Sequence, residues 1–156
     1  MFYNHIIMYM IFIIVVIITV AISIIDIKTF KIPDILLISL YSVLLVYTMF
    51  TDSFITIIAS IISSIMLFLV FFLIFKYRGG IGFGDVKYAG VIGYALGFQN
   101  ALYACLIASL TGIIFIFIFR ILIPRIRKTS SVMKRKLAFG PFLSFGLVLV
   151  YYNKLI

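Results

Sequence analysis

Long apolar runs are the feature that most limits how this chain can fold. Residues 6–25 form one such run, and its only clearly polar members are Thr19 and Ser23. A helix of about 20 residues is long enough to cross the apolar layer of a membrane. The whole chain shares this character, with 66% hydrophobic residues, 11% charged residues and a mean hydropathy of +1.37. The composition excludes an ordinary soluble domain and predicts an all-α, polytopic membrane protein.

Five further apolar segments follow the first, so we expect six transmembrane helices in a single domain over residues 1–156. A cleavable signal peptide is the alternative for the first segment, but no basic residue precedes it, so we expect it to be retained. Asp34 is expected to cap the second helix, and Asp52 or Ser53 the third. The predicted segments are residues 6–25, 35–50, 54–75, 86–98, 101–123 and 139–152, with a turn at 99–100 and a hydrophilic loop at 124–136.

The fourth segment is short and rich in small residues. Ala89, Gly93 and Gly97 follow one another at intervals of four, and Gly90 lies beside them. Small residues at this spacing let helices pack closely in lipid. We therefore expect this segment to be buried among the other helices.

The basic residues predict the orientation of the helices. With six spans, all but one of the 13 Lys and Arg residues fall on one side, Arg120 extending from a helix end, and only Lys154 falls on the other. The positive-inside rule makes the basic side cytoplasmic and both termini external in the cytoplasmic membrane. The net charge of +9 lies in short connections without interleaved aromatic residues. We therefore expect the lipid bilayer, and not a nucleic acid, as the partner of these charges.

All four acidic residues are aspartates, and two of them are predicted to meet. Asp26 closes the first helix and Asp85 opens the fourth, on the same side of the membrane. A carboxylate at membrane depth costs roughly 2.5–3.5 kcal/mol and therefore indicates a functional site. Two neighbouring carboxylates retain one proton between them, because repulsion and desolvation both raise a pKa. One can then take a proton from water while the other donates one, as aspartyl hydrolysis requires.

Each of these aspartates also has an ordinary structural interpretation. Asp26 can be an interface carboxylate paired with Lys28 or Lys31, and Asp85 can be a helix cap or a partner of Lys87. Lys87 itself can influence the protonation of the pair, contact a substrate backbone, or extend to the interface.

The other polar candidates are less suited to a site. The Pro33-Asp34 sequence favours a capping role for Asp34, and Asp52 lies on the opposite face, where it can only cap. His5 precedes the first span and is expected to have no ligand role. The single cysteine, Cys105, allows no disulfide or Cys-based metal site within the chain, so we expect no metal and no cofactor.

Four glycines, at positions 79, 80, 82 and 84, precede Asp85 and suit a tight loop in which a peptide must approach the backbone. At these residues the chain resembles the type IV prepilin peptidases, which are intramembrane aspartyl proteases of the GxGD type. Residues 82–87 resemble the GxGDxK signature of that family. Residues 26–34 resemble its first aspartate, basic loop and Ile-Pro-Asp, and residues 138–142 resemble its C-terminal FGPF element.

This resemblance implies a six-helix GxGD protease fold with Asp26 and Asp85 as the catalytic pair. It implies supporting or substrate-binding roles for residues of the matched motifs, namely Asp34, Gly82, Gly84, Lys87, Gly140 and Pro141. The implied substrates are prepilins or pseudopilins, cut at the cytoplasmic face after a short basic leader that ends in Gly. Oligomeric state is not indicated.

One departure from the family pattern matters. Bifunctional members carry an N-terminal region with paired cysteines and also methylate their product, whereas here the first span begins at about residue 6. We therefore expect the short, peptidase-only form that serves tight-adherence pili and archaeal-type filaments. The alternatives are a presenilin-like protease acting on other helices and a non-enzymatic membrane protein, either a small proton-coupled transporter or a secretion or pilus assembly subunit.

Overall fold

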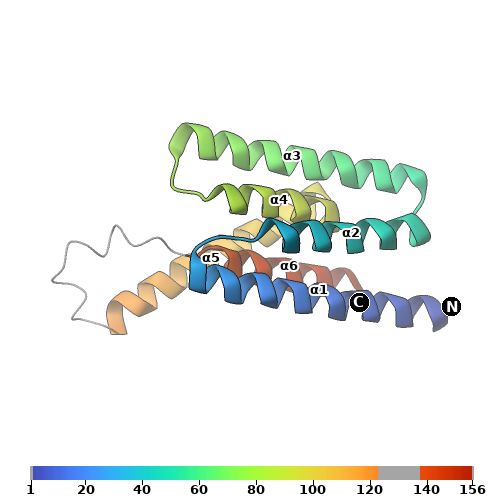
Figure 1. The fold of residues 1–156 in the computed structure, drawn as a ribbon, viewed down its shortest axis with the longest axis horizontal. Coiled ribbons are helices and arrows are strands. Elements are labelled where there is room, and N and C mark those ends of the chain that lie inside the picture. The colour runs from blue at the N-terminus through green and yellow to red at the C-terminus, as the bar shows by residue number, and fades with distance from the viewer. Residues whose placement is uncertain (1, 123–137, 156) are drawn as a thin grey trace.

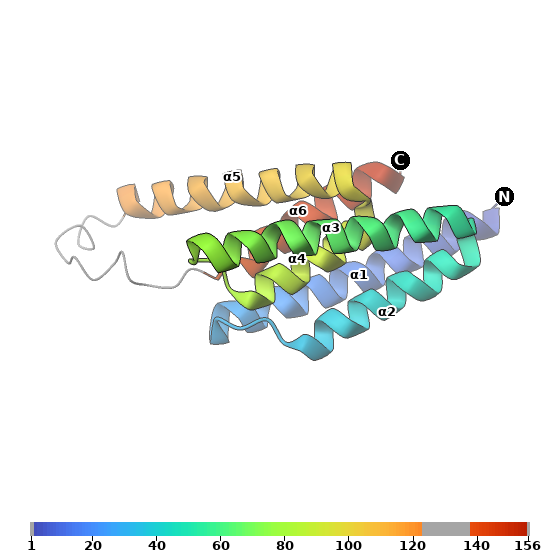
Figure 2. The same ribbon diagram turned by 90° about the horizontal axis from the view of Figure 1, so that it is seen from above.

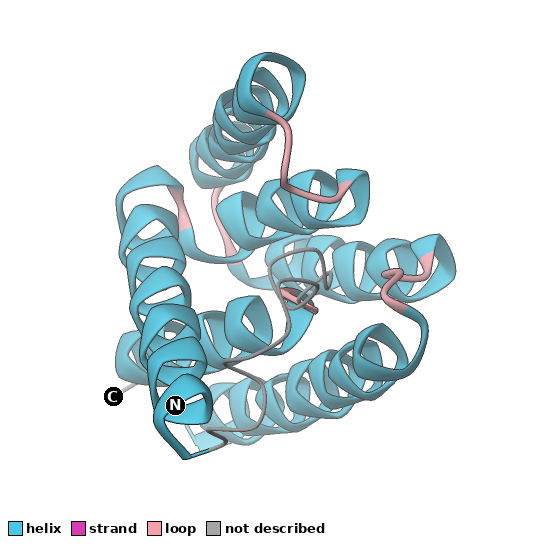
Figure 3. Ribbon diagram, turned by 90° about the vertical axis from the view of Figure 1, so that its left-hand side faces the viewer, coloured by secondary structure: helices cyan, strands magenta, loops and turns pink. Residues whose placement is uncertain are grey.

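The computed structural model describes the backbone of residues 2–122 and 138–155, and the side chains of residues 7–118 and 138–154. The predicted loop at 124–136 and the side chains of His5 and Arg120 lie outside these ranges. Each of the six predicted segments forms a helix, and the described residues contain no strand (Figure 3). The helices are α1 (Phe2–Thr29), α2 (Asp34–Thr51), α3 (Phe54–Arg78), α4 (Phe83–Leu96), α5 (Phe98–Leu122) and α6 (Gly140–Leu155).

The helices form a bundle in which α1 begins and α6 ends at the same end (Figure 1). The α1–α2 and α3–α4 connections and the start of α6 lie at the other end, which we call the loop end (Figures 1 and 2). Helices α1, α2, α3 and α5 are long and apolar enough to cross a membrane, and their outward-facing side chains are mainly large and apolar. Helices α4 and α6 have 14 and 16 residues and are shorter than a full span.

Helix α1 is longer than predicted and ends abruptly. It continues through Asp26 to Thr29, so that Asp26 lies in its last turn. Phe30 then adopts a φ of 53°, and its backbone N–H donates to the Asp26 carbonyl at 2.8 Å. A left-handed residue at this position is a common way to end a helix, although it normally falls to glycine. The chain therefore turns sharply back toward the bundle.

The expected cap of α2 at Asp34 is wrong. Pro33 occupies the N-cap position, and its carbonyl accepts the N–H groups of Leu36 and Leu37. Asp34 becomes the first helical residue, and its carboxylate is left free for a distant partner. The expectation for α3 is confirmed at Ser53, whose hydroxyl accepts the Thr56 N–H at 3.4 Å.

The predicted turn at residues 99–100 is also wrong, because the chain turns two residues earlier. Gly97 adopts a φ of 78°, which a side chain would disfavour, and its N–H bonds to the Gly93 carbonyl. Helix α5 can therefore begin at Phe98. The Asn100 side chain donates to the Leu96 carbonyl and helps to satisfy the end of α4.

Helix α4 is buried among the other helices, as predicted from its small residues. All of its residues from Tyr88 to Leu96 are buried. A methyl group on Gly93 would lie 2.7 Å from the Ser63 carbonyl oxygen of α3, so the two backbones meet there directly. This contact lets a short helix occupy the centre of the bundle.

We predict that Gly93→Ala destabilises the protein by about 1–3 kcal/mol, because the added methyl group overlaps the α3 backbone. Gly90→Ala is the matched control in the same helix, since its methyl group would make an ordinary contact at 3.4 Å with Phe68 Cβ. Thermal unfolding in detergent measures both variants. Equal losses of stability would show that the α3–α4 contact is not as close as described.

Candidate active site

Asp26 is buried in the last turn of α1 and is held by the start of α6. It is 4% exposed, and its Oδ2 accepts the backbone N–H of Gly140 at 2.9 Å. Gly140 is the first residue of α6, where N–H groups have no partner within the helix and the helix dipole favours a negative charge. A methyl group on Gly140 would lie 2.7 Å from Oδ2. Only glycine therefore brings the backbone this close to the carboxylate.

Pro141 follows in the same turn and fits it for a related reason. Proline has no N–H to donate, and the first turn of a helix does not need one. The 138–142 element thus supplies one backbone donor, from Gly140, directly to Asp26.

Asp85 lies in the first turn of α4, outside the four long helices. Its Oδ2 accepts the Gly82 N–H at 3.2 Å, and its own N–H donates to the Gly82 carbonyl at 3.0 Å. The capping interpretation is therefore correct in part, with Asp85 as the third helical residue and Gly82 at the N-cap position. Asp85 caps its own helix and still presents a second carboxylate oxygen to its surroundings.

The two carboxyl groups interact electrostatically. Burial raises the pKa of Asp85 to about 6, the hydrogen bond from Gly82 opposes this rise, and the negative charge of Asp26 adds to it. The end of α1 and the start of α4 lie at the same end of the bundle (Figures 1 and 2), and the charge of Asp26 acts on Asp85 there. Such a pair can accept a proton at one member and donate one from the other.

The α1–α2 connection is fixed onto the first turn of α4 by two contacts. Ile32 is buried, and its Cβ would lie 3.0 Å from a methyl group on Gly84. The Lys87 Nζ donates to both carboxylate oxygens of Asp34 at 2.7 and 2.8 Å. Gly84, Lys87 and Asp34 therefore hold the segment that follows Asp26 against the helix that carries Asp85.

The ion pairs considered from the sequence are different from those observed. Lys87 pairs with Asp34 and not with Asp85, and Asp26 pairs with neither Lys28 nor Lys31. Asp52 is exposed at the opposite end of the bundle, where its carboxylate accepts the Thr51 hydroxyl at 3.3 Å. Among the described residues, no three His, Cys, Asp or Glu side chains gather as a metal site.

A buried hydrogen-bond network below the aspartates was missed by the sequence analysis. The Tyr88 hydroxyl bonds to Ser144 Oγ at 2.9 Å, and Ser144 Oγ donates to the Thr19 carbonyl at 3.2 Å. All three residues are buried. The network joins α4, α6 and α1, the same three helices that supply Asp85, Gly140 and Asp26. Helical spacing was the available signal, since Tyr88 lies one turn after Asp85 and Ser144 one turn after Gly140.

Comparisons with known proteins bear on the function of the chain. Residues 9–117 match the sequence profile of the type IV leader peptidase family, and this range contains Asp26 and Asp85. The chain is 30% identical over 132 residues to a protein of Pectobacterium carotovorum subsp. carotovorum named prepilin leader peptidase/N-methyltransferase. That match covers 81% of this chain and 45% of the relative, so the chain spans less than half of the relative's length. No solved structure matches the chain.

We predict that cysteines placed at positions 26 and 85, in a Cys105→Ala background, are joined by a short bismaleimide cross-linker, because both positions lie at the loop end. Mass spectrometry of the digested protein identifies the linked peptides. Cysteines at positions 26 and 52 are the control, since Asp52 lies at the other end of the bundle. Efficient linkage of the control pair, or none of the first pair, would contradict the arrangement.

We also predict that Asp26→Asn lowers the pKa of Asp85. The charge of Asp26 raises this pKa, so its removal stabilises the ionised form of Asp85. Infrared titration of the protonated carboxyl stretch measures the shift, and Asp52→Asn is expected to leave it unchanged. An unaltered Asp85 titration in Asp26→Asn would mean that the two groups are not coupled.

Proposed function

Because the chain belongs to the type IV leader peptidase family, we propose that it is an intramembrane aspartyl endopeptidase. It removes the short basic leader of prepilin-like or pseudopilin substrates at the cytoplasmic face of the membrane. The family membership and the relative named as a prepilin leader peptidase support the substrate class. The carboxyl pair Asp26 and Asp85 is the observation that carries the mechanism.

The surroundings of the two carboxyl groups suit different roles. Asp26 accepts an N–H at the start of α6, and this hydrogen bond favours the ionised form of its carboxyl group. Asp85 has a pKa raised to about 6 and is the better holder of the shared proton. Asp26 is therefore the general base in this scheme, and Asp85 is the general acid.

Cleavage then proceeds with a balanced transfer of protons. Asp26 takes a proton from water as the water oxygen bonds to the carbonyl carbon of the scissile peptide, while protonated Asp85 polarises the carbonyl oxygen. When the C–N bond breaks, the departing nitrogen receives a proton from the pair. The leader gains a carboxylate, the remainder gains an amino terminus, and the pair again holds one proton.

The distribution of charge supports cleavage at the cytoplasmic face. Lys28 and Lys31 follow Asp26 closely, and Lys76, Arg78 and Lys87 flank the glycine loop, so these cations gather at the loop end. Lys154 lies near the end of α6, at the opposite end. The positive-inside rule then turns the loop end to the cytoplasm and both chain termini to the outside.

We predict that Asp26→Asn and Asp85→Asn each reduce leader removal by about 10²–10⁴-fold, the usual contribution of a general acid or base. The assay follows mass loss from a synthetic prepilin peptide in vesicles that contain the purified protein. Each variant must insert at the unsubstituted level. Persistent cleavage in either variant would exclude the carboxyl pair as the catalytic group.

Asp52→Asn is the matched control and should leave the cleavage rate unchanged. Loss of cleavage in this variant, with normal insertion, would contradict the proposed topology. A purified protein that leaves the peptide intact under all conditions would favour the assembly-subunit alternative over the enzyme.

A further inference from the structure

Helices α2 and α3 diverge toward the loop end and leave part of α4 between them. They are joined by the short turn around Asp52 and Ser53 and separate with distance from it (Figures 1 and 2). The first half of α4, which begins two residues before Asp85, lies in the widening space. This space opens to the outside of the bundle.

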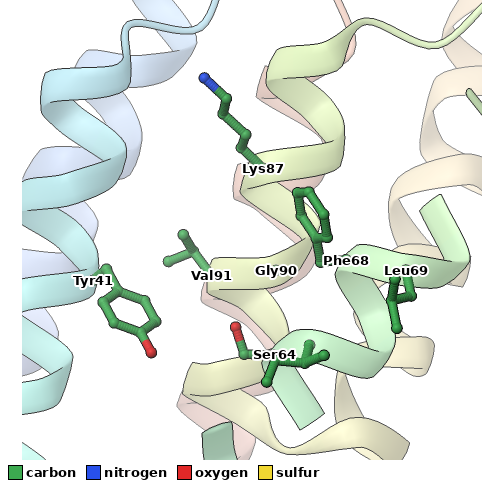
Figure 4. A pocket seen from close by; sticks show the side chains of 8 residues that line it. Tyr41, Ser64, Phe68, Leu69, Lys87, Gly90 and Val91 are labelled. Atoms are coloured by element: carbon green, nitrogen blue, oxygen red, sulfur yellow. The ribbon is translucent and has the colours of Figure 1, made fainter. Parts of the chain in front are cut away.

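The diverging helices enclose a groove of about 490 Å³ on the surface of α4. Tyr41 of α2 and Ser64 and Phe68 of α3 form its sides, and Lys87 and Gly90 of α4 form its floor (Figure 4). A second cavity of about 380 Å³ adjoins it, shares Tyr41 and Lys87, and extends to Asp34. The groove therefore runs from the Asp34–Lys87 ion pair along α4 toward the middle of the bundle.

The lining of the groove suits a helix better than it suits acyl chains. Ser64 is small and half-buried on the groove wall, so a helix in the groove can approach α3 closely there, as at other helix contacts in membranes. Within the described residues, the Tyr41 and Ser64 hydroxyls have no hydrogen-bond partner. Lipid chains cannot supply one, whereas a polar side chain of a helix can.

We propose that this groove is the docking site for the apolar helix of the leader-bearing substrate. The inference rests on the proposed peptidase function and adds the place where the substrate is held. Lys87 lies two residues after Asp85 on α4. A substrate that leaves the groove at Lys87 therefore needs only a few extended residues, at about 3.3 Å each, to pass around the first turn of α4 and reach Asp85. The side chain of Asp34 at the mouth is 59% exposed, so a basic residue of the leader can compete with Lys87 for its carboxylate.

Photo-cross-linking tests the docking directly. The probe is a synthetic peptide with a basic leader followed by an apolar helix of about 20 residues, inserted in vesicles with the Asp85→Asn protein. A photoreactive residue at position 64 should capture the probe, and one at position 109 should not, because Ser109 is exposed on α5 outside the groove. Capture of lipid alone at position 64, or equal capture at both positions, would overturn the proposal.

A steric variant gives a second measurement. Ser64→Phe fills the groove and should lower capture of the probe by a photoreactive residue at position 69, on the groove wall. It should also lower the kcat/KM for cleavage of the probe, and we expect each decrease to be about tenfold or more. Ser109→Phe is the matched control and should change neither. If Ser64→Phe fails to insert into the membrane, Leu69→Trp replaces it, because Leu69 is 49% exposed and tolerates a larger side chain. Capture is then read from a photoreactive residue at position 64. Unchanged capture in these variants would refute docking, whereas normal capture without cleavage by the unsubstituted protein would refute only the peptidase function.

Discussion

The arrangement of this protein depends on the need to bond a carboxylate that lies inside a helical membrane bundle. An unsatisfied charge there is costly, so Asp26 requires a donor that no neighbouring apolar side chain provides. The Gly140 N–H supplies it, which brings the start of α6 against the end of α1. The Tyr88–Ser144–Thr19 network then ties α4 to both helices, and Asp85 is carried to the same end of the bundle.

Glycine determines how closely these parts approach. Gly140 leaves room for the Asp26 carboxylate, Gly84 for Ile32 of the α1–α2 connection, and Gly93 for the backbone of α3. Together they allow a helix of only 14 residues to lie within longer helices and still reach the loop end with its charged first turn. The proposed substrate groove exists because α3 contacts α4 closely at Gly93 and then diverges from α2.

Most of the helices, and the position of the end of α1 and the start of α4 at one end of the bundle, could be predicted from the sequence, because apolar length and charged interruptions are strong signals in a membrane protein. Local competition between neighbouring residues was harder to judge. Pro33 takes the capping position expected for Asp34, and Gly97 ends α4 before the polar pair at 99–100. The Tyr88 network was missed, because helical spacing was its main signal and lipid and core are both apolar. Hydropathy therefore does not show which side of a helix faces inward.

The donors that hold the two carboxylates belong to the main chain. Gly140 and Gly82 provide amides that every residue except proline possesses, so substitution by any other residue leaves these donors in place. Such a change acts through the bulk of the new side chain. Removal of one such bond without added bulk requires chemical synthesis of the protein with an ester in place of that amide.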